Sequence, residues 1–131
     1  MSLTLAEANR IVEGALAKAK ELNILISAVV VDGGGRLLAF QRMDNATWAS
    51  VFGCQGKAIA AAGFGRTSGE LQGRADAPII RGIVAAEGGH MRPSQGAVPI
   101  MRDGQVIGAC GVGGGTSQED EDCASAGIAK I

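Results

Sequence analysis

Two stretches of this chain each consist of a pair of apolar runs separated by a short turn that contains Asp-Gly. The first is ILISAVVVDGGGRLLAFQR, and the second contains AVPIM, then RDGQ, then VIGACGV. Asp-Gly between apolar runs is among the strongest local signals for a β-hairpin, and β-branched residues crowd the first run. We therefore predict two hairpins, the first with strands over residues 24–31 and 36–42 and the second turning at residues 102–105.

A helix is predicted before the first hairpin. Thr4-Leu5-Ala6-Glu7 is a capping-box pattern, in which Thr4 accepts from the amide three residues on while Glu7 reaches back to the N–H of Thr4. Apolar residues then recur with helical spacing on one face. The pattern predicts a helix over residues 5–22, with Asn23 as its stop.

The segments between and after the hairpins are also predicted to be helical. A helix over residues 47–62 carries an apolar stripe and ends at glycines, and a looser helical stretch over residues 68–84 is broken near Pro78. Residues 87–96 are predicted to be a loop, and residues 120–129 a closing helix. The stripe on the second helix consists of Trp48, Val51, Phe52, Ile59 and Ala62.

The order α-β-β-α-α-β-β-α predicts one α+β domain over residues 1–131, a sandwich whose central antiparallel sheet carries helices. A further short strand is expected near His90. Glycine accounts for 21 residues and alanine is about as frequent, so many side chains contribute little apolar area to a core. We therefore expect a homo-oligomer, a dimer or larger, whose interfaces use the Ala- and Gly-rich surfaces.

Composition argues against several classes of protein. The formal net charge is -1 and the basic residues are scattered, so no nucleic-acid partner is expected. The chain has no long apolar span or secretory leader, so no membrane partner is expected. The three cysteines form no CxxC pair and are predicted to be small buried side chains. These features indicate a cytoplasmic protein.

The glycine cluster of GACGVGGGTSQEDED is predicted to be the entry to the last helix and not a phosphate loop. No Lys follows the glycines, as a P-loop requires. The run from Glu119 to Asp122 already complements the helix N-terminus and would repel phosphate. We expect this acidic run to be solvated.

The chain resembles the GlcG/HbpS family, the haem-degrading domain that is also similar to the C-terminal domain of PduO-type proteins. The matching stretches are LAEANRIVEGALAKAKE, SAVVVDGGGRLLAFQRMDNA, GKAIAAAGF and GAVPIMRDGQVIGACGVGGGTSQEDEDCASAG. The resemblance implies a profilin-like fold, assembly into dimers or rings, and haem or a corrinoid as ligand. Where the family usually has Arg-Met-Asp-Gly-Ala, this chain has Asn45, which tolerates the left-handed conformation of such a turn.

Four polar residues are candidates for a site. His90 is the only histidine and could ligate haem or a corrinoid, act as a general acid or base, or bond only to its own loop. No other metal site is expected. Arg42 could bind a substrate carboxylate or a haem propionate, or pair with Asp44. Lys57 could anchor an anion, form an imine, or be solvated.

We expect these groups to converge on one cleft, within a subunit or between subunits. The charges of Arg42 and Lys57 would select a small anionic ligand, and Phe64 or Met91 would form an apolar wall. Two functions fit this arrangement. One is a small-molecule-binding protein that takes haem or a corrinoid; no cofactor is required by the sequence itself. The other is a cofactor-independent enzyme for a carboxylate-bearing catabolic intermediate, with proton transfer, imine chemistry or hydrolysis carried out by Lys57 or His90.

Overall fold

The computed structural model describes residues 2–131 and is built on one antiparallel sheet. Its strands are β1 (Ser27–Asp32), β2 (Leu37–Arg42), β3 (Ala97–Arg102) and β4 (Gln105–Gly113). They are arranged in the order β2-β1-β4-β3, so the two predicted hairpins are present and join through their strands β1 and β4.

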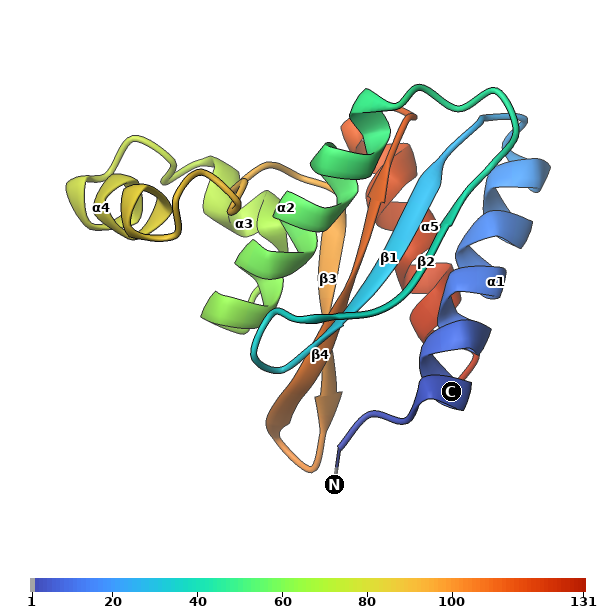
Figure 1. Cartoon of the computed structure of the whole chain (residues 1–131), viewed down its shortest axis with the longest axis horizontal. Helices are drawn as coiled ribbons and strands as arrows, with labels where there is room; N and C mark the ends of the chain where they lie inside the picture. The colour runs from blue at the N-terminus through green and yellow to red at the C-terminus, as the bar shows by residue number, and fades with distance from the viewer. Residues whose placement is uncertain (1) are drawn as a thin grey trace.

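Helices cover both faces of the sheet (Figure 1). On one face lie α1 (Leu5–Glu21) and α5 (Ser117–Ile128), which pack against each other. On the other face lies α2 (Ala49–Phe64), followed by the short α3 (Ser68–Gln72) and by α4 (Pro78–Ala86), which projects to one side. The predicted α+β architecture is confirmed. The middle helical stretch is two separate helices, which gives the order α-β-β-α-α-α-β-β-α.

Strand β1 is buried on both of its faces. Ala28 and Val30 point into the core beneath α1 and α5, whereas Val29 and Val31 point into the core beneath α2. This alternation follows from the two-residue period of a strand. It explains why the run AVVV is continuously apolar in the sequence.

Helix α2 lies very close to strand β4 because small residues meet at the contact. A Cβ atom placed on Gly111 would lie 2.1 Å from the carbonyl oxygen of Cys54. The buried face of α2 consists of small side chains, among them Ala58 and Ala61. The apolar stripe predicted from the sequence is therefore not the face that packs on the sheet: Trp48 and Phe52 are 71% and 61% exposed.

Helices α1 and α5 each begin with a capping box. Thr4 and Glu7 form the predicted one, with Glu7 N donating to Thr4 Oγ1 at 3.1 Å. Thr116 and Glu119 form a second one, so α5 begins at Ser117, earlier than predicted. The turn after β2 also forms as expected, with Asn45 at φ 68°.

Among residues 2–131 the segment around His90 contains no strand, so the short strand expected there is absent. No helix within those residues combines the length and the apolar character needed to span a bilayer.

Candidate functional site

Helix α2 has two sides that face pockets, and the helical period separates them. Phe52, Gln55, Gly56 and Ile59 lie on one side, at spacings of three and four residues. Ser50, Gly53 and Lys57 lie on another side at the same spacings. The structure therefore places two different pockets along one helix.

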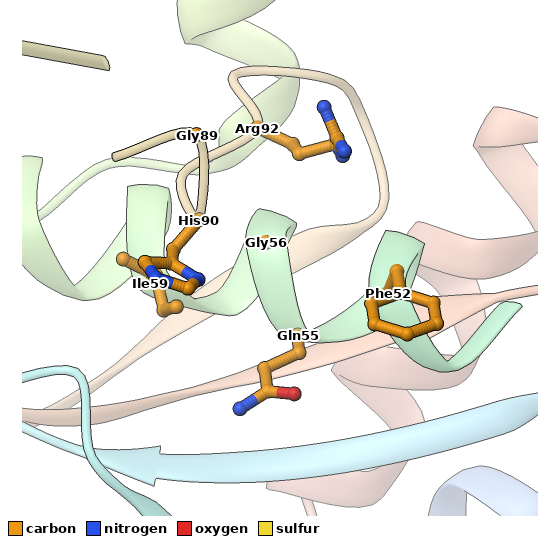
Figure 2. Close-up of a pocket in the computed structure, with 7 residues that line it drawn as sticks. All are labelled: Phe52, Gln55, Gly56, Ile59, Gly89, His90 and Arg92. Atoms are coloured by element: carbon orange, nitrogen blue, oxygen red, sulfur yellow. The ribbon is translucent and has the colours of Figure 1, made fainter. Parts of the chain in front are cut away.

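The first pocket, here called the His90 pocket, lies between α2 and the loop that follows α4. Its volume is about 280 Å³. Figure 2 shows the imidazole of His90 next to Ile59, with Gln55 and Phe52 further along α2. It is lined by Phe52, Gln55, Gly56, Ile59, Gly89, His90 and Arg92.

The loop that carries His90 is fixed against α2. Gly88 and Gly89 adopt φ 71° and 85°, which reverses the chain after α4. The N–H of Arg92 donates to the carbonyl oxygen of Gly56 at 3.0 Å. A Cβ atom on Gly56 would lie 2.4 Å from Cγ of Arg92, so only glycine admits the loop at this distance.

The imidazole of His90 is exposed and has no hydrogen-bond partner among residues 2–131. Both ring nitrogens are thus available to a ligand. The side chain of Arg92 is exposed at the same pocket, and Phe52 and Ile59 supply apolar surface. The pocket combines a potential metal ligand, a cation and an apolar wall.

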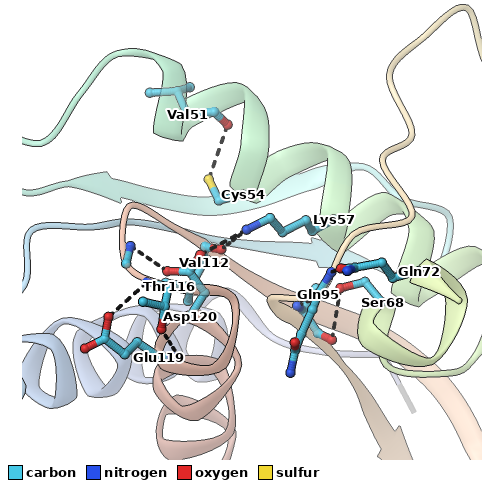
Figure 3. A network of polar contacts seen from close by, with 12 residues as sticks. Val51, Cys54, Lys57, Ser68, Gln72, Gln95, Val112, Thr116, Glu119 and Asp120 are labelled. Atoms are coloured by element: carbon cyan, nitrogen blue, oxygen red, sulfur yellow. Dashed lines mark hydrogen bonds and ion pairs between the residues drawn. The ribbon is translucent and has the colours of Figure 1, made fainter.

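The second pocket, here called the Lys57 pocket, has a volume of about 640 Å³ and a lining that is about equally polar and apolar. It lies between the first turns of α2, the glycine loop after β4 and the segment before β3. Figure 3 shows the contacts of Lys57, Asp120 and Gln95 that surround it. It is lined by Thr47, Ala49, Ser50, Gly53, Lys57, Gln72, Ser94, Gln95, Gly113, Gly114, Gly115, Ser117 and Asp120.

Lys57 and Asp120 form an ion pair at this pocket. Nζ of Lys57 lies 3.0 Å from Oδ2 of Asp120 and donates to the carbonyl oxygen of Val112 at 3.0 Å. Oδ1 of Asp120 accepts from the N–H of Gly115 at 2.8 Å. Burial raises the pKa of Asp120, while Lys57 and the Gly115 amide act in the opposite direction.

The expectation that the run from Glu119 to Asp122 is solvated is wrong for one residue, since Asp120 is 2% exposed. Helical spacing could have revealed this. Asp120 lies on the same face of α5 as Cys123, Ala124 and Gly127, which are all buried. Arg92 was also missed by sequence reasoning, because only the fold brings its loop onto α2.

Within one chain the predicted site residues do not share a cleft. Lys57 and His90 line different pockets, and neither Arg42 nor Asp44 lines either of them. Arg42 and Asp44 are exposed at the end of β2, and no ion pair joins them in the described part of the chain. Met91 is 4% exposed and packs with Phe64 in a small core beneath α2 and α3.

The cysteines do not add a reactive group. All three are buried and unpaired with one another, as predicted, and burial raises the pKa of the Cys54 thiol to about 12. Residues 2–131 contain no cluster of three His, Cys, Asp or Glu side chains that could hold a metal ion.

Comparison with known proteins agrees with the fold and the motifs. Residues 3–129 match the family described as haem degrading protein HbpS-like. The chain is 32% identical over 120 residues to a 15.0 kDa protein of the dhaT–dhaS intergenic region of Citrobacter freundii, covering 91% of this chain and 84% of that one. It is 34% identical over 113 residues to protein GlcG of Escherichia coli, covering 80% and 76%.

Solved structures give the same result. The Klebsiella pneumoniae protein ORFY superposes with a TM-score of 0.89 at 30% identity, covering 98% of this chain and 89% of that one. A PduOC–haem complex superposes with a TM-score of 0.90 at 25% identity, covering 100% and 96%. The match extends over residues 3–129, so this chain belongs to the HbpS-like family of haem-degrading proteins, together with its GlcG and PduO C-terminal relatives.

Proposed function

We propose that this protein binds haem in the His90 pocket, with His90 as the iron ligand. The observation that supports this most directly is the state of the imidazole, which is exposed and has no hydrogen-bond partner among residues 2–131. A neutral imidazole is the commonest protein ligand of haem iron. The crystal structure of a relative in complex with haem lends further support.

The residues around His90 fit the rest of a haem molecule. Phe52 and Ile59 offer apolar surface to the ring, and the guanidinium of Arg92 suits a propionate carboxylate. Bound haem would supply an iron centre for one-electron and oxygen chemistry. The protein would orient the ring through the loop that Gly56 holds against α2.

The pocket is small for a whole porphyrin, so part of the ring would lie outside it. Trp48 and Phe52 continue the apolar surface along α2, with their ring centroids 6.0 Å apart in an edge-to-face arrangement.

We propose that a second copy of the chain covers this apolar surface at Trp48 and Phe52. Light scattering should give a mass above that of one chain at micromolar concentration, and Trp48→Glu should lower it; a stable monomer would contradict the proposed assembly.

A hemin titration tests the proposed ligand. Hemin should produce a saturable, shifted Soret band with one equivalent per chain, and His90→Ala should abolish the shift. Arg92→Gln should weaken binding by about tenfold, as expected for the loss of one charge-assisted contact. Arg74→Gln serves as the matched control, because Arg74 is exposed and lies outside the pocket.

The titration also separates haem from a corrinoid. Hydroxocobalamin added in place of hemin should leave its own visible spectrum unchanged if the pocket prefers haem. A Soret shift that persists unaltered in His90→Ala would rule out His90 as the ligand. A spectral change with hydroxocobalamin that is lost in His90→Ala, without any response to hemin, would favour the corrinoid.

A further inference from the structure

We propose that the Lys57 pocket is a second ligand site, which takes a small organic monocarboxylate. The site is separate from the His90 pocket, because the two lie on different sides of α2 and share no lining residue. The inference therefore does not depend on haem binding.

Both members of the buried pair line the pocket, and the cation is the more exposed of the two. The side chain of Lys57 is 13% exposed, whereas that of Asp120 is 3% exposed. An ammonium has three N–H donors, and among residues 2–131 Nζ has two acceptors, on Asp120 and Val112. One N–H is left for a ligand, and a carboxylate oxygen is its strongest partner.

Another group at the pocket also donates. Oε1 of Gln72 accepts from the N–H of Gln95 at 2.8 Å, which leaves the NH₂ group of Gln72 without an acceptor in the described part of the chain. A group that only accepts hydrogen bonds, as a carboxylate does, matches these donors.

The charge of the pocket limits the charge of its ligand. Among residues 2–131, Lys57 and Asp120 are the only ionisable residues that line it, and their charges balance each other. A carboxylate that shares the ammonium with Asp120 leaves the site with one negative charge in excess, whereas a phosphate dianion or a dicarboxylate would leave two. No aromatic side chain of the described residues lines the pocket, so the remainder of the ligand is expected to be small and polar or aliphatic.

Gly53 leaves room for the ligand between Ser50 and Lys57. A Cβ atom at this position would meet no other atom within 4 Å, although the residue lies inside α2. Elsewhere on α2, glycine is required by close packing, as at Gly56. At Gly53 the absent side chain instead keeps a passage open to the ammonium.

The same position supplies the test variant. Gly53→Leu should fill the pocket while improving helix propensity, so the fold should be kept. Gly82→Leu is the matched control, since Gly82 is also inside a helix with open space around it and lies outside the pocket. Lys57→Met, checked for folding by its thermal melt, removes the ammonium itself.

Lactate and butyrate, each compared with its amide, are the probes, and binding is followed by shifts of backbone amide signals in ¹⁵N NMR spectra. We expect saturable shifts at Gly113, Gly114, Gly115 and Ser117 with at least one acid and not with its amide. Gly53→Leu and Lys57→Met should each raise the dissociation constant about tenfold or more, and Gly82→Leu should leave it unchanged.

Three results would overturn the proposal. One is the absence of saturable shifts with both acids, and another is equal binding of an acid and its amide. The third is binding that persists in Gly53→Leu. A hemin titration of Gly53→Leu tests whether the two sites are independent. The Soret shift assigned to His90 should be the same as in the unmodified protein, because Gly53 does not line the His90 pocket.

Discussion

Nζ of Lys57 and Oδ2 of Asp120 lie 3.0 Å apart although 63 positions separate the two residues in the sequence. The contact joins α2, on one face of the sheet, to α5, on the other, past the end of β4 (Figure 3). Because both side chains are largely buried, each depends on the other to offset its desolvation. The pair is therefore structural as well as part of the proposed carboxylate site.

Lys57→Met should lower the free energy of unfolding by about 3 kcal/mol near neutral pH, because it leaves the Asp120 carboxylate buried without a counter-charge. Urea denaturation measures this directly. Burial already raises the pKa of Asp120 in the folded state, and loss of Lys57 would raise it further. A raised folded-state pKa means that stability is gained as pH falls through that value, so the defect should shrink as pH is lowered from neutral towards 3.8, the ordinary pKa of an Asp side chain.

The double variant Lys57→Met/Asp120→Asn provides the control. It removes both charges while an amide oxygen can still accept from the N–H of Gly115. It should be more stable near neutral pH than Lys57→Met alone. A single variant as stable as the unmodified protein would mean that the pair is solvated in solution.

Local sequence signals were sufficient for most of the fold. The hairpins depend on Asp-Gly turns, and the first helix on Thr4 and Glu7, so each could be predicted without its neighbours. The division of the middle helical stretch is less clear from the sequence, because a proline within a helical pattern indicates a break there. In the structure Pro78 begins α4, a position that its fixed φ favours and where its missing N–H costs nothing.

The orientation of α2 could not be predicted from periodicity. The helix is apolar on more than one side, with large residues at Trp48 and Phe52 and small residues at Cys54 and Ala58. The prediction named only the stripe of large residues. The small face packs inward because Gly111 on β4 admits a helix only at very short distance. The close packing of Gly111 against Cys54 involves two segments far apart in sequence, and so does the ion pair between Lys57 and Asp120. Local periodicity carries no information on either contact.

Thr4→Ala and Thr116→Ala should each lower the free energy of unfolding by about 1 kcal/mol, since each residue accepts a hydrogen bond from the third residue of its helix. Thermal or urea melts provide the measurement. Thr4→Ser and Thr116→Ser keep the accepting hydroxyl and should behave nearly as the unmodified protein does. An unchanged midpoint in an alanine variant would show that its helix end does not depend on the cap.

Glu7 should contribute to the loss of stability in acid. Its hydrogen bonds with Thr4, together with Arg102, lower the pKa of Glu7 from 4.5 to about 2. A folded-state pKa below the unfolded value stabilises the protein above 4.5, and this contribution is lost as pH falls from 4.5 towards 2. Glu7→Gln should therefore melt earlier at neutral pH and show a shallower decline in melting temperature over that range. Parallel curves for both proteins would contradict this assignment.

Two glycines in different surroundings, Gly111 at the contact between α2 and β4 and Gly82 in α4, should respond in opposite ways to substitution by alanine. Gly111→Ala should destabilise the protein by about 1–3 kcal/mol, because its new methyl group would meet the backbone oxygen of Cys54, and backbone cannot rotate away as a side chain can. Gly82→Ala, inside α4 with open space around it, should instead stabilise by up to about 1 kcal/mol through helix propensity. Urea denaturation of both variants separates packing from propensity. If Gly111→Ala were as stable as the unmodified protein, α2 would have to lie further from the sheet than the structure places it.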